Sequence, residues 1–373
     1  MAETVRGRPR RVPVREDLED IPVYVPGLAP SDVAAGPPPS EVVKLSANEN
    51  PLGPSPLAVE ALQRAAWEAH RYPDSACRAL REALAARLGV AASQIVVGNG
   101  ADNLISLLAD ALVAPGEAVA VPRVSFSSYA IAARVRRARV QSVPMAGWEI
   151  DEEALLAALH QGARVAFLCN PNNPTGLLLS RDRLFRLVDR LPDERVLVLD
   201  EAYVEFAEDP SAQEVGPELV RQGAPVVVLR TFSKIYGLAG LRVGYALAPA
   251  PVAQAMWRVR EVFATNRLAE AAALAALSDE AHVRRSREMV QQGRHQLYGL
   301  LGAMGLEYLP SQANFLWVRT GVPSQELVPR LAREGVLVRP GHFWGYPDWL
   351  RVTVGTAAQN LRFAEVLGTA LHS

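Results

Sequence analysis

Lys234 is one of only two lysines in this chain, although the sequence carries 39 basic residues, of which the remaining 37 are arginine. Arginine stays protonated in proteins, whereas a lysine amine can be held neutral and then acts as a nucleophile or a base. Such an amine condenses with an aldehyde to form an imine, and once released it can move a proton at a nearby carbon. Lys234 is therefore a candidate for covalent chemistry, whereas we assign no covalent role to Lys44.

The residues around Lys234 suit an aldehyde that also carries a phosphate. Ser233 supplies a hydroxyl and Arg242 a guanidinium, and the glycines between them allow the backbone to approach a phosphate closely. The segment Gly98–Asp102 opens a predicted helix, and the first amides of a helix form a natural phosphate site. A phosphate site made from these two segments is therefore expected.

Asp200 ends an apolar run, where a carboxylate is costly unless it is paired. Opposite a pyridine nitrogen it would keep the ring protonated and able to draw electrons from a substrate, although it could instead cap a turn. Tyr203 and Asn173 could donate to a phenolate oxygen on the same ring, and Phe126 or Tyr129 could stack on its face. Together these features predict pyridoxal 5'-phosphate as the cofactor.

Short apolar runs alternate with amphipathic stretches from about residue 94 onwards, which predicts an α/β fold with a mostly parallel sheet between two layers of helices. Ligands of such sheets bind beyond the carboxyl ends of the strands, and candidate residues follow four of them. The expected strands are Gln94–Val97, Ala118–Val121, Val140–Val143, Val165–Leu168, Val196–Leu199, Val226–Leu229 and Val243–Leu247. The expected helices between them include Ala101–Val113, Asp151–His160 and Arg181–Leu191.

A smaller α+β domain is predicted to follow. The expected helices Arg267–Leu277 and Ala281–Gly302 lead into it. Its strands lie in Gly305–Arg319, Gly335–Arg339 and Trp349–Val354, and its last helix is about Gln359–Leu371. We divide the chain into a disordered basic tail (1–20), an N-terminal arm with the start of the small domain (21–60), a large cofactor-binding domain (61–279) and a small C-terminal domain (280–373).

Composition limits the partners that we expect. The net charge of -1 does not favour nucleic acid, and no apolar run approaches the ~20 residues of a membrane helix. Cys77 and Cys169 do not make a disulfide framework, and the histidines lack the spacing of metal ligands. We therefore expect a cytoplasmic enzyme that acts on small molecules without a metal.

The order of these motifs resembles the fold-type-I aminotransferases, and among them the histidinol-phosphate aminotransferases. The resemblance runs from about Tyr24 to the C-terminus. Besides the segments named above, the motifs that carry it are Tyr24-Val-Pro-Gly, Lys44-Leu-Ser-Ala-Asn-Glu-Asn-Pro-Leu-Gly-Pro, Arg71-Tyr72-Pro-Asp and Leu350-Arg351-Val-Thr-Val-Gly. It implies a fold-type-I pyridoxal-phosphate transferase that forms a homodimer and takes a small-molecule amino donor and keto acceptor.

The resemblance also implies a role for each site residue. Lys234, Asp200 and Tyr203 would be catalytic. The cofactor would be bound by Ala101, Asp102, Phe126, Asn173, Asp200, Tyr203, Thr231, Ser233, Lys234 and Arg242, with Tyr72 reaching the phosphate from the neighbouring subunit. The substrate would be bound by Tyr24, Asn48, Tyr129, Arg339 and Arg351, with Tyr24 also coming from the neighbouring subunit.

Three reactions fit these residues. The first is amino transfer between histidinol phosphate and 2-oxoglutarate in histidine biosynthesis. The second is amino transfer from aromatic amino acids. This alternative stays open because Phe263 lacks the phenol hydroxyl that the family tends to have in this segment, which borders the substrate pocket. The third is decarboxylation of a phosphorylated amino acid. A cofactor-binding transcription regulator is disfavoured, because the stretch before Leu18 is too short for a winged-helix domain.

Overall fold

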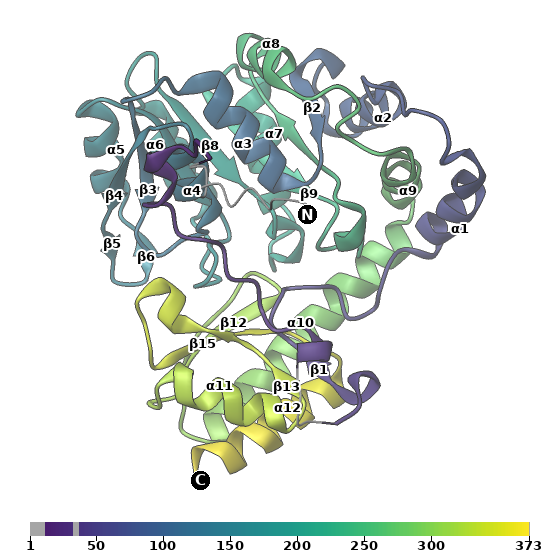
Figure 1. Cartoon of the computed structure of the whole chain (residues 1–373), viewed down its shortest axis with the longest axis vertical. Helices are drawn as coiled ribbons and strands as arrows, with labels where there is room; N and C mark the ends of the chain where they lie inside the picture. The colour runs from purple at the N-terminus through teal and green to yellow at the C-terminus, as the bar shows by residue number, and fades with distance from the viewer. Residues whose placement is uncertain (1–11, 33–36, 373) are drawn as a thin grey trace, which may run out of the picture.

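A seven-stranded sheet forms the centre of the large domain (Figure 1). The computed structural model describes residues 12–32 and 37–372. The strand order is β2-β10-β9-β8-β7-β3-β4, and β10 is antiparallel to both neighbours whereas the other pairs are parallel. The strands are β2 (Ile95–Gly98), β3 (Ala118–Pro122), β4 (Arg139–Val143), β7 (Ala163–Cys169), β8 (Val196–Asp200), β9 (Val226–Thr231) and β10 (Gly244–Leu247). The predicted mostly parallel sheet is confirmed.

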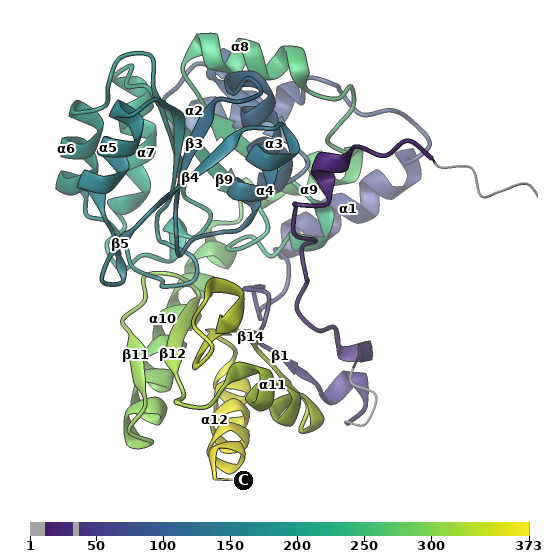
Figure 2. The same cartoon turned by 60° about the vertical axis from the view of Figure 1, so that its left-hand side comes forward.

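Helices cover both faces of this sheet, because its strands are apolar on both sides and bury nearly every side chain. Figure 2 shows α3, α4 and α8 on one face and α5, α6 and α7 on the other. Their bounds are α3 (Ala101–Leu112), α4 (Ser128–Val135), α5 (Glu152–His160), α6 (Arg181–Asp189), α7 (Ala212–Arg221) and α8 (Ala250–Val259). Three further helices, α1 (Pro56–Ala65), α2 (Arg78–Leu88) and α9 (Arg267–Leu277), pack together beside the sheet.

The small domain contains an antiparallel sheet of order β11-β12-β15-β14, packed against three helices. Its elements are β11 (Glu307–Leu309), β12 (Phe315–Arg319), β14 (Arg339–Pro340), β15 (Trp349–Thr353), α10 (Glu280–Ala303), α11 (Ser324–Arg333) and α12 (Ala357–Leu371). The predicted strand region Gly305–Arg319 contains two strands. In the turn between them the Ser311 amide donates to the Tyr298 hydroxyl, and the Ser311 hydroxyl accepts from the Ala313 amide. The N-terminal arm joins this domain through β1 (Val43–Lys44), which pairs in parallel with β13 (Val336–Leu337).

Two connections fix the small domain against the large one. Helix α10 leads from one domain into the other (Figure 1). Trp148, in the turn between β5 (Met145–Ala146) and β6 (Glu149–Ile150), packs on the small domain, with its ring centroid 4.7 Å from that of Tyr346 and 4.5 Å from that of Trp349. A hairpin of the large domain is therefore docked beside the strand that carries Arg351.

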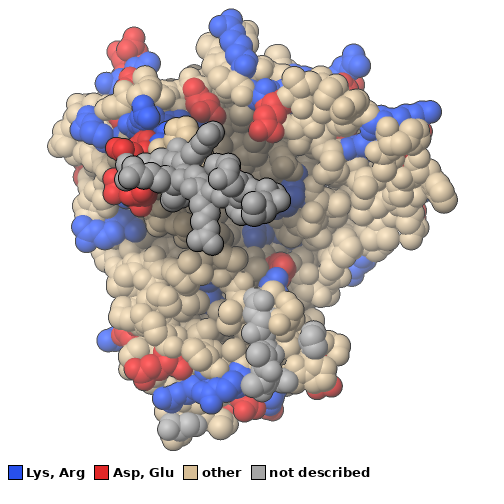
Figure 3. Space-filling model, in the orientation of Figure 1, with Lys and Arg blue, Asp and Glu red and all other residues tan. Residues whose placement is uncertain are grey.

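The start of the described chain lies on the large domain. Of the tail that we predict to be disordered, residues 1–11 lie outside the described residues, whereas Glu16–Leu18 form a 3-10 turn. Asp17 joins this turn to Arg137 through an ion pair of 2.9 Å. Acidic and basic side chains are interspersed over the face shown in Figure 3. In the part of the chain that the structure describes, no helix has the length and apolar content needed to cross a membrane.

Candidate active site

One cavity, of about 1020 Å³ including its open mouth, lies at the carboxyl edge of the large sheet. It receives side chains that follow β2, β7, β8 and β9, because these strands run in the same direction and end at the same edge. The N-terminal arm and the small domain supply the remaining walls. The predicted site residues that line it are Tyr24, Asn48, Ala101, Asp102, Phe126, Asn173, Asp200, Tyr203, Thr231, Ser233, Lys234, Arg242, Arg339 and Arg351.

Lys234 lies just beyond β9, with its amine in the cavity. Its Nζ donates to the carbonyl of Ala47 at 3.1 Å and lies 5.7 Å from the centroid of the Tyr203 ring. Burial, assisted by the nearby charge of Arg351, lowers the pKa of Lys234 to about 8. An appreciable share of this amine is therefore neutral near neutral pH, which is the form that attacks an aldehyde or accepts a proton.

Asp200 ends β8 at the floor of the cavity, where its side chain is 3% exposed. Its Oδ1 accepts from the amide of Ala202 at 3.0 Å and its Oδ2 from the hydroxyl of Tyr129 at 2.6 Å. Burial raises the pKa of Asp200 to about 6, against the effect of these two hydrogen bonds. Among the described residues no basic side chain pairs with this carboxylate, so it lacks the opposite charge that a protonated pyridine nitrogen would supply. The cavity floor fits that nitrogen.

Tyr203 directs a hydroxyl into the cavity beside Asp200. Its oxygen accepts from the side-chain amides of Asn48 at 3.1 Å and Asn173 at 3.3 Å. Because a phenol has one hydrogen to donate, the Tyr203 hydrogen remains available for an acceptor in the cavity. The ring of Phe126 lines the same space. These groups fit the oxygen and the face of an aromatic cofactor ring.

The N-terminus of α3 and the side chain of Arg242 form the opposite end of the cavity. Arg242 Nη1 lies 3.4 Å from Ser233 Oγ, and Nη2 lies 3.5 Å from an oxygen of Asp102. Gly100 caps the helix with a φ of 82°, and a Cβ there would lie 2.5 Å from Arg242 Nη2. The absence of that side chain leaves a basic cradle in front of the first amides of α3, which suits a phosphate.

Arg339 and Arg351 lie opposite each other on β14 and β15 and form a second basic region. Arg351 donates to Asn173 Oδ1 and to the carbonyl of Ser46, both at 2.7 Å, and Arg339 donates to the carbonyl of Val25 at 2.7 Å. Both arginines are buried, and three polar atoms here have no protein partner, namely Arg351 Nε, Arg339 Nη1 and Ser46 Oγ. Burial lowers the pKa of Arg351 to about 10, so it remains a cation at neutral pH. Neither cation has an acidic partner among the described residues, so the pair is suited to binding an anion.

Two predicted site residues do not line this cavity. Tyr72 is 78% exposed and stacks on Phe263, with ring centroids 4.7 Å apart, so only a neighbouring subunit could use it as predicted. Tyr129, predicted to bind substrate, is fully buried behind Asp200. It cannot contact a ligand in the cavity because its ring packs in the core against Phe167.

Some cavity residues are not singled out by the sequence. Ser46, Ala47 and Glu49 belong to the motif around Asn48, which carries the resemblance but not their individual roles. Cys169 and Ala202 also line the cavity. Cys169 is the last residue of β7 and Ala202 follows the end of β8, so their position at strand ends is the signal that could have found them.

The model of the family described as aminotransferase class I and II matches residues 40–367. The chain belongs to this aminotransferase family. Histidinol-phosphate aminotransferase of Symbiobacterium thermophilum is 44% identical to it over 96% of this chain and 98% of the relative. Histidinol-phosphate aminotransferase of Moorella thermoacetica is also 44% identical, over 95% of this chain and 92% of the relative.

A solved structure of histidinol-phosphate aminotransferase from Sinorhizobium meliloti, in complex with pyridoxal 5'-phosphate, superposes with a TM-score of 0.87 at 28% identity, covering 99% of both chains. The predicted fold-type-I architecture is thereby confirmed. Because the family match and this neighbour agree with the fit of the cavity, the cofactor of this aminotransferase is pyridoxal 5'-phosphate. The individual site residues remain predictions.

Replacing Lys234 with arginine is expected to keep the charge but remove the amine that bonds the cofactor aldehyde. The purified Lys234→Arg variant should lack the visible absorbance band of covalently held cofactor and lose nearly all turnover. Lys44→Arg is the matched control, because Lys44 does not line the cavity and arginine can keep its ion pair with Glu49, which is 2.8 Å long. A Lys234→Arg protein that keeps both the band and the turnover would contradict the assignment.

Asp200→Asn is expected to preserve the shape of the cavity floor while removing the charge that holds the ring nitrogen protonated. Cofactor should still bind through Lys234 and the phosphate cradle, but amino transfer should slow by orders of magnitude. Stopped-flow measurement of the glutamate half-reaction separates the two effects, with Asp209→Asn on an exposed turn as the control. Turnover near the parent rate would mean that Asp200 is a structural cap.

Proposed function

We propose that this aminotransferase transfers the amino group between histidinol phosphate and 2-oxoglutarate, a step of histidine biosynthesis. The observation that carries the proposal is the pair Arg339 and Arg351, buried at one end of the cavity with unpaired N–H groups. A phosphate ester brings a charge of roughly -2, which two guanidinium groups can share. A monocarboxylate such as phenylalanine would need mainly Arg351. The names of the relatives support the same substrate.

Each residue of the cavity has a separate task in this reaction. When bound, pyridoxal phosphate supplies an aldehyde for amine exchange and a ring that withdraws electrons from the substrate α-carbon. Lys234 bonds the cofactor and, once released, takes the proton from the α-carbon. Asp200 holds a proton on the ring nitrogen, while Tyr203 and Asn173 donate to the ring oxygen. Arg351 orients the substrate by its anionic end.

The same basic region accepts both substrates in turn. Histidinol phosphate would place its phosphate, and glutamate its α-carboxylate, against this basic region. The nearby Tyr24 ring lies 5.6 Å from the guanidinium carbon of Arg339, and the Phe343 ring lies 4.2 Å from it. These rings limit the access of water, which strengthens the attraction between the arginines and a bound anion.

We further propose that the enzyme is a cytoplasmic homodimer. The exposed large apolar residues include Trp67 (85%), Tyr72 (78%), Val262 (71%) and Phe263 (40%), and the rings of Tyr72 and Phe263 stack on each other. A second copy of the chain would cover these residues and place Tyr72 at the partner's phosphate cradle, as the resemblance implies. Tyr24, also predicted to come from the neighbouring subunit, instead lines the cavity of its own chain beside Arg339. The unpaired thiols of Cys77 and Cys169 suit a reducing compartment.

Arg339→Gln should distinguish a phosphorylated substrate from a simple amino acid. The loss of one guanidinium is expected to cost about 1.5–3 kcal/mol in transition-state binding of histidinol phosphate, roughly 10- to 150-fold in kcat/KM, and much less for phenylalanine. Arg333→Gln, an exposed change on α11, serves as the control.

Steady-state kinetics with both substrates decide the matter. Equal losses of kcat/KM for the two substrates would show that Arg339 does not bind the phosphate. Activity on phenylalanine without activity on histidinol phosphate would replace the proposed substrate with an aromatic amino acid. Release of carbon dioxide from a phosphorylated amino acid would indicate a decarboxylase instead.

Subunit mixing tests whether Tyr72 acts in the neighbouring subunit. Lys234→Arg and Tyr72→Ala proteins should each be weakly active, but a hybrid dimer contains one site with an intact Lys234 and an intact Tyr72. After unfolding and refolding of an equal mixture, activity should return to about a quarter of the parent value. A mixture no more active than its components would show that Tyr72 does not act in the neighbouring subunit, and a fully active Tyr72→Ala protein would place Tyr72 outside the active site. Light scattering would show whether a dimer forms.

A further inference from the structure

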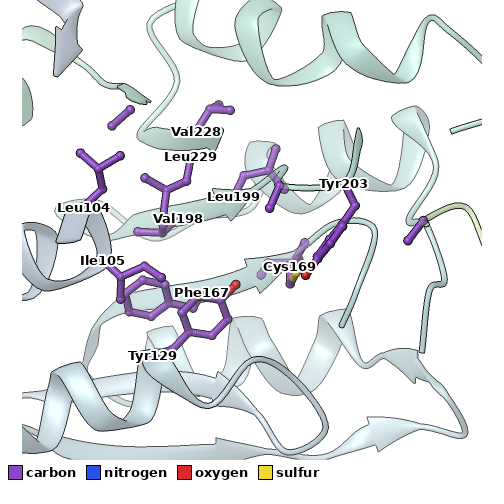
Figure 4. Close-up of a cluster of buried hydrophobic side chains, with 14 of the residues drawn as sticks. Leu104, Ile105, Tyr129, Phe167, Cys169, Val198, Leu199, Tyr203, Val228 and Leu229 are labelled. Atoms are coloured by element: carbon purple, nitrogen blue, oxygen red, sulfur yellow. The ribbon is translucent and has the colours of Figure 1, made fainter. Parts of the chain in front are cut away.

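Tyr129 is the largest polar side chain buried directly behind the active-site floor. It lies on α4 with no exposed surface, and its ring stacks on Phe167 with centroids 4.7 Å apart and an interplanar angle of 9°. The edge of this stack meets the ring of Phe126, whose centroid is 5.6 Å away. Figure 4 shows Tyr129 beside Phe167, with its hydroxyl directed towards Cys169. Packing therefore fixes the position of the hydroxyl.

That hydroxyl is committed to Asp200. It donates to Asp200 Oδ2 at 2.6 Å, a length typical of a hydrogen bond from a hydroxyl to an ionised carboxylate. Burial raises the pKa of Tyr129 far above its ordinary value, so the phenol keeps its proton at any working pH. The amide of Ala202 donates to the other oxygen. The two donors come from different elements and together fix the plane of the carboxylate.

Among the side chains that face Asp200, Tyr129 contributes most to stabilising the ionised carboxylate. Asp102, on α3, disfavours the ionised form of Asp200, whereas Lys234, beyond β9, favours it weakly. Cys169, on the adjacent strand β7, stays a neutral thiol because burial raises its pKa, and burial likewise keeps the Tyr203 phenol neutral. Burial raises the pKa of Asp200, and the hydrogen bond from Tyr129 is the largest opposing influence.

We propose that Tyr129 is a positioning residue of the reaction, whose hydroxyl keeps the Asp200 carboxylate ionised and aimed at the cofactor ring nitrogen. Its ring also supports Phe126, which lines the cavity. Tyr129 acts through these two residues and touches neither cofactor nor substrate. The proposal depends on the cofactor and on the role of Asp200, and it is independent of which amino acid is the substrate.

Tyr129→Phe removes the hydroxyl and keeps the ring stack. Without this donor the pKa of Asp200 rises. When the pH is lowered, the Asp200 carboxylate of the variant therefore becomes protonated at a higher pH than that of the parent. The affinity of cofactor-free enzyme for pyridoxal phosphate, followed by quenching of tryptophan fluorescence, should therefore begin to fall about one pH unit higher than in the parent. Groups on the cofactor titrate alike in both proteins and cancel in the comparison.

Tyr298→Phe is the matched control, because it also removes a hydrogen-bonded phenol hydroxyl, one that accepts from the Ser311 amide, and Tyr298 does not line the cavity. Its affinity profile should coincide with that of the parent. In turnover, Tyr129→Phe should lower kcat about tenfold with little change in KM. An affinity profile of Tyr129→Phe that matches the parent at every pH would overturn the proposal.

A double-mutant cycle separates positioning from packing. In the Asp200→Asn background there is no carboxylate to keep ionised, so adding Tyr129→Phe should cost little further kcat. An equal cost in both backgrounds would show that Tyr129 only fills the core, which overturns the proposal even if the single variant is slow. Because the affinity measurement uses no substrate, it cannot fail through a wrong choice between histidinol phosphate and another amino acid.

Discussion

A carboxylate enclosed by an apolar sheet, as Asp200 is, is stable only if its surroundings balance its charge. In this aminotransferase two hydrogen bonds orient the carboxylate, and no basic side chain of the described residues neutralises it. A protonated cofactor ring bound there would supply the missing charge. The rest of the cavity fits this arrangement, because such a ring would reach the end of β8 while its phosphate would meet the start of α3. The spacing of β8 and β2 in the sheet sets the distance between these two points.

Arg351 couples this ring site to the position of the small domain. It belongs to β15, yet it donates to Asn173 in the large domain and to the carbonyl of Ser46 in the N-terminal arm. Asn173 in turn donates to Tyr203. An anion bound at Arg351 would therefore contact a network that spans both domains and ends at Tyr203. The docking of Trp148 on Trp349, which lies two residues before Arg351 and on the same face of β15, also holds this geometry.

The sequence allowed the large sheet and most of the cavity to be predicted, because both depend on local patterns. Buried parallel strands are continuous apolar runs, and the polar residue after each run marks the ligand edge, as at Asp200 and Lys234. The position of Tyr129 could not be predicted from the sequence. It follows Phe126 by three residues, and which of the two rings faces the cavity depends on how the chain enters α4 and packs on β7. The pairing of Arg339 with Arg351 likewise depends on strand register, which neither short segment determines alone.

The charges of the cavity also connect substrate binding to catalysis. Burial is the main cause that lowers the pKa of Lys234, and the nearby cations Arg351 and Arg242 lower it further. A substrate anion bound at Arg351 would offset the charge of Arg351, and a cofactor phosphate at Arg242 would offset that of Arg242. Both ligands would therefore make a freed Lys234 amine more basic. On this assignment the amine is neutral enough to bond the cofactor before the substrate binds, and it would become a stronger base when the substrate α-carbon is present to give up its proton.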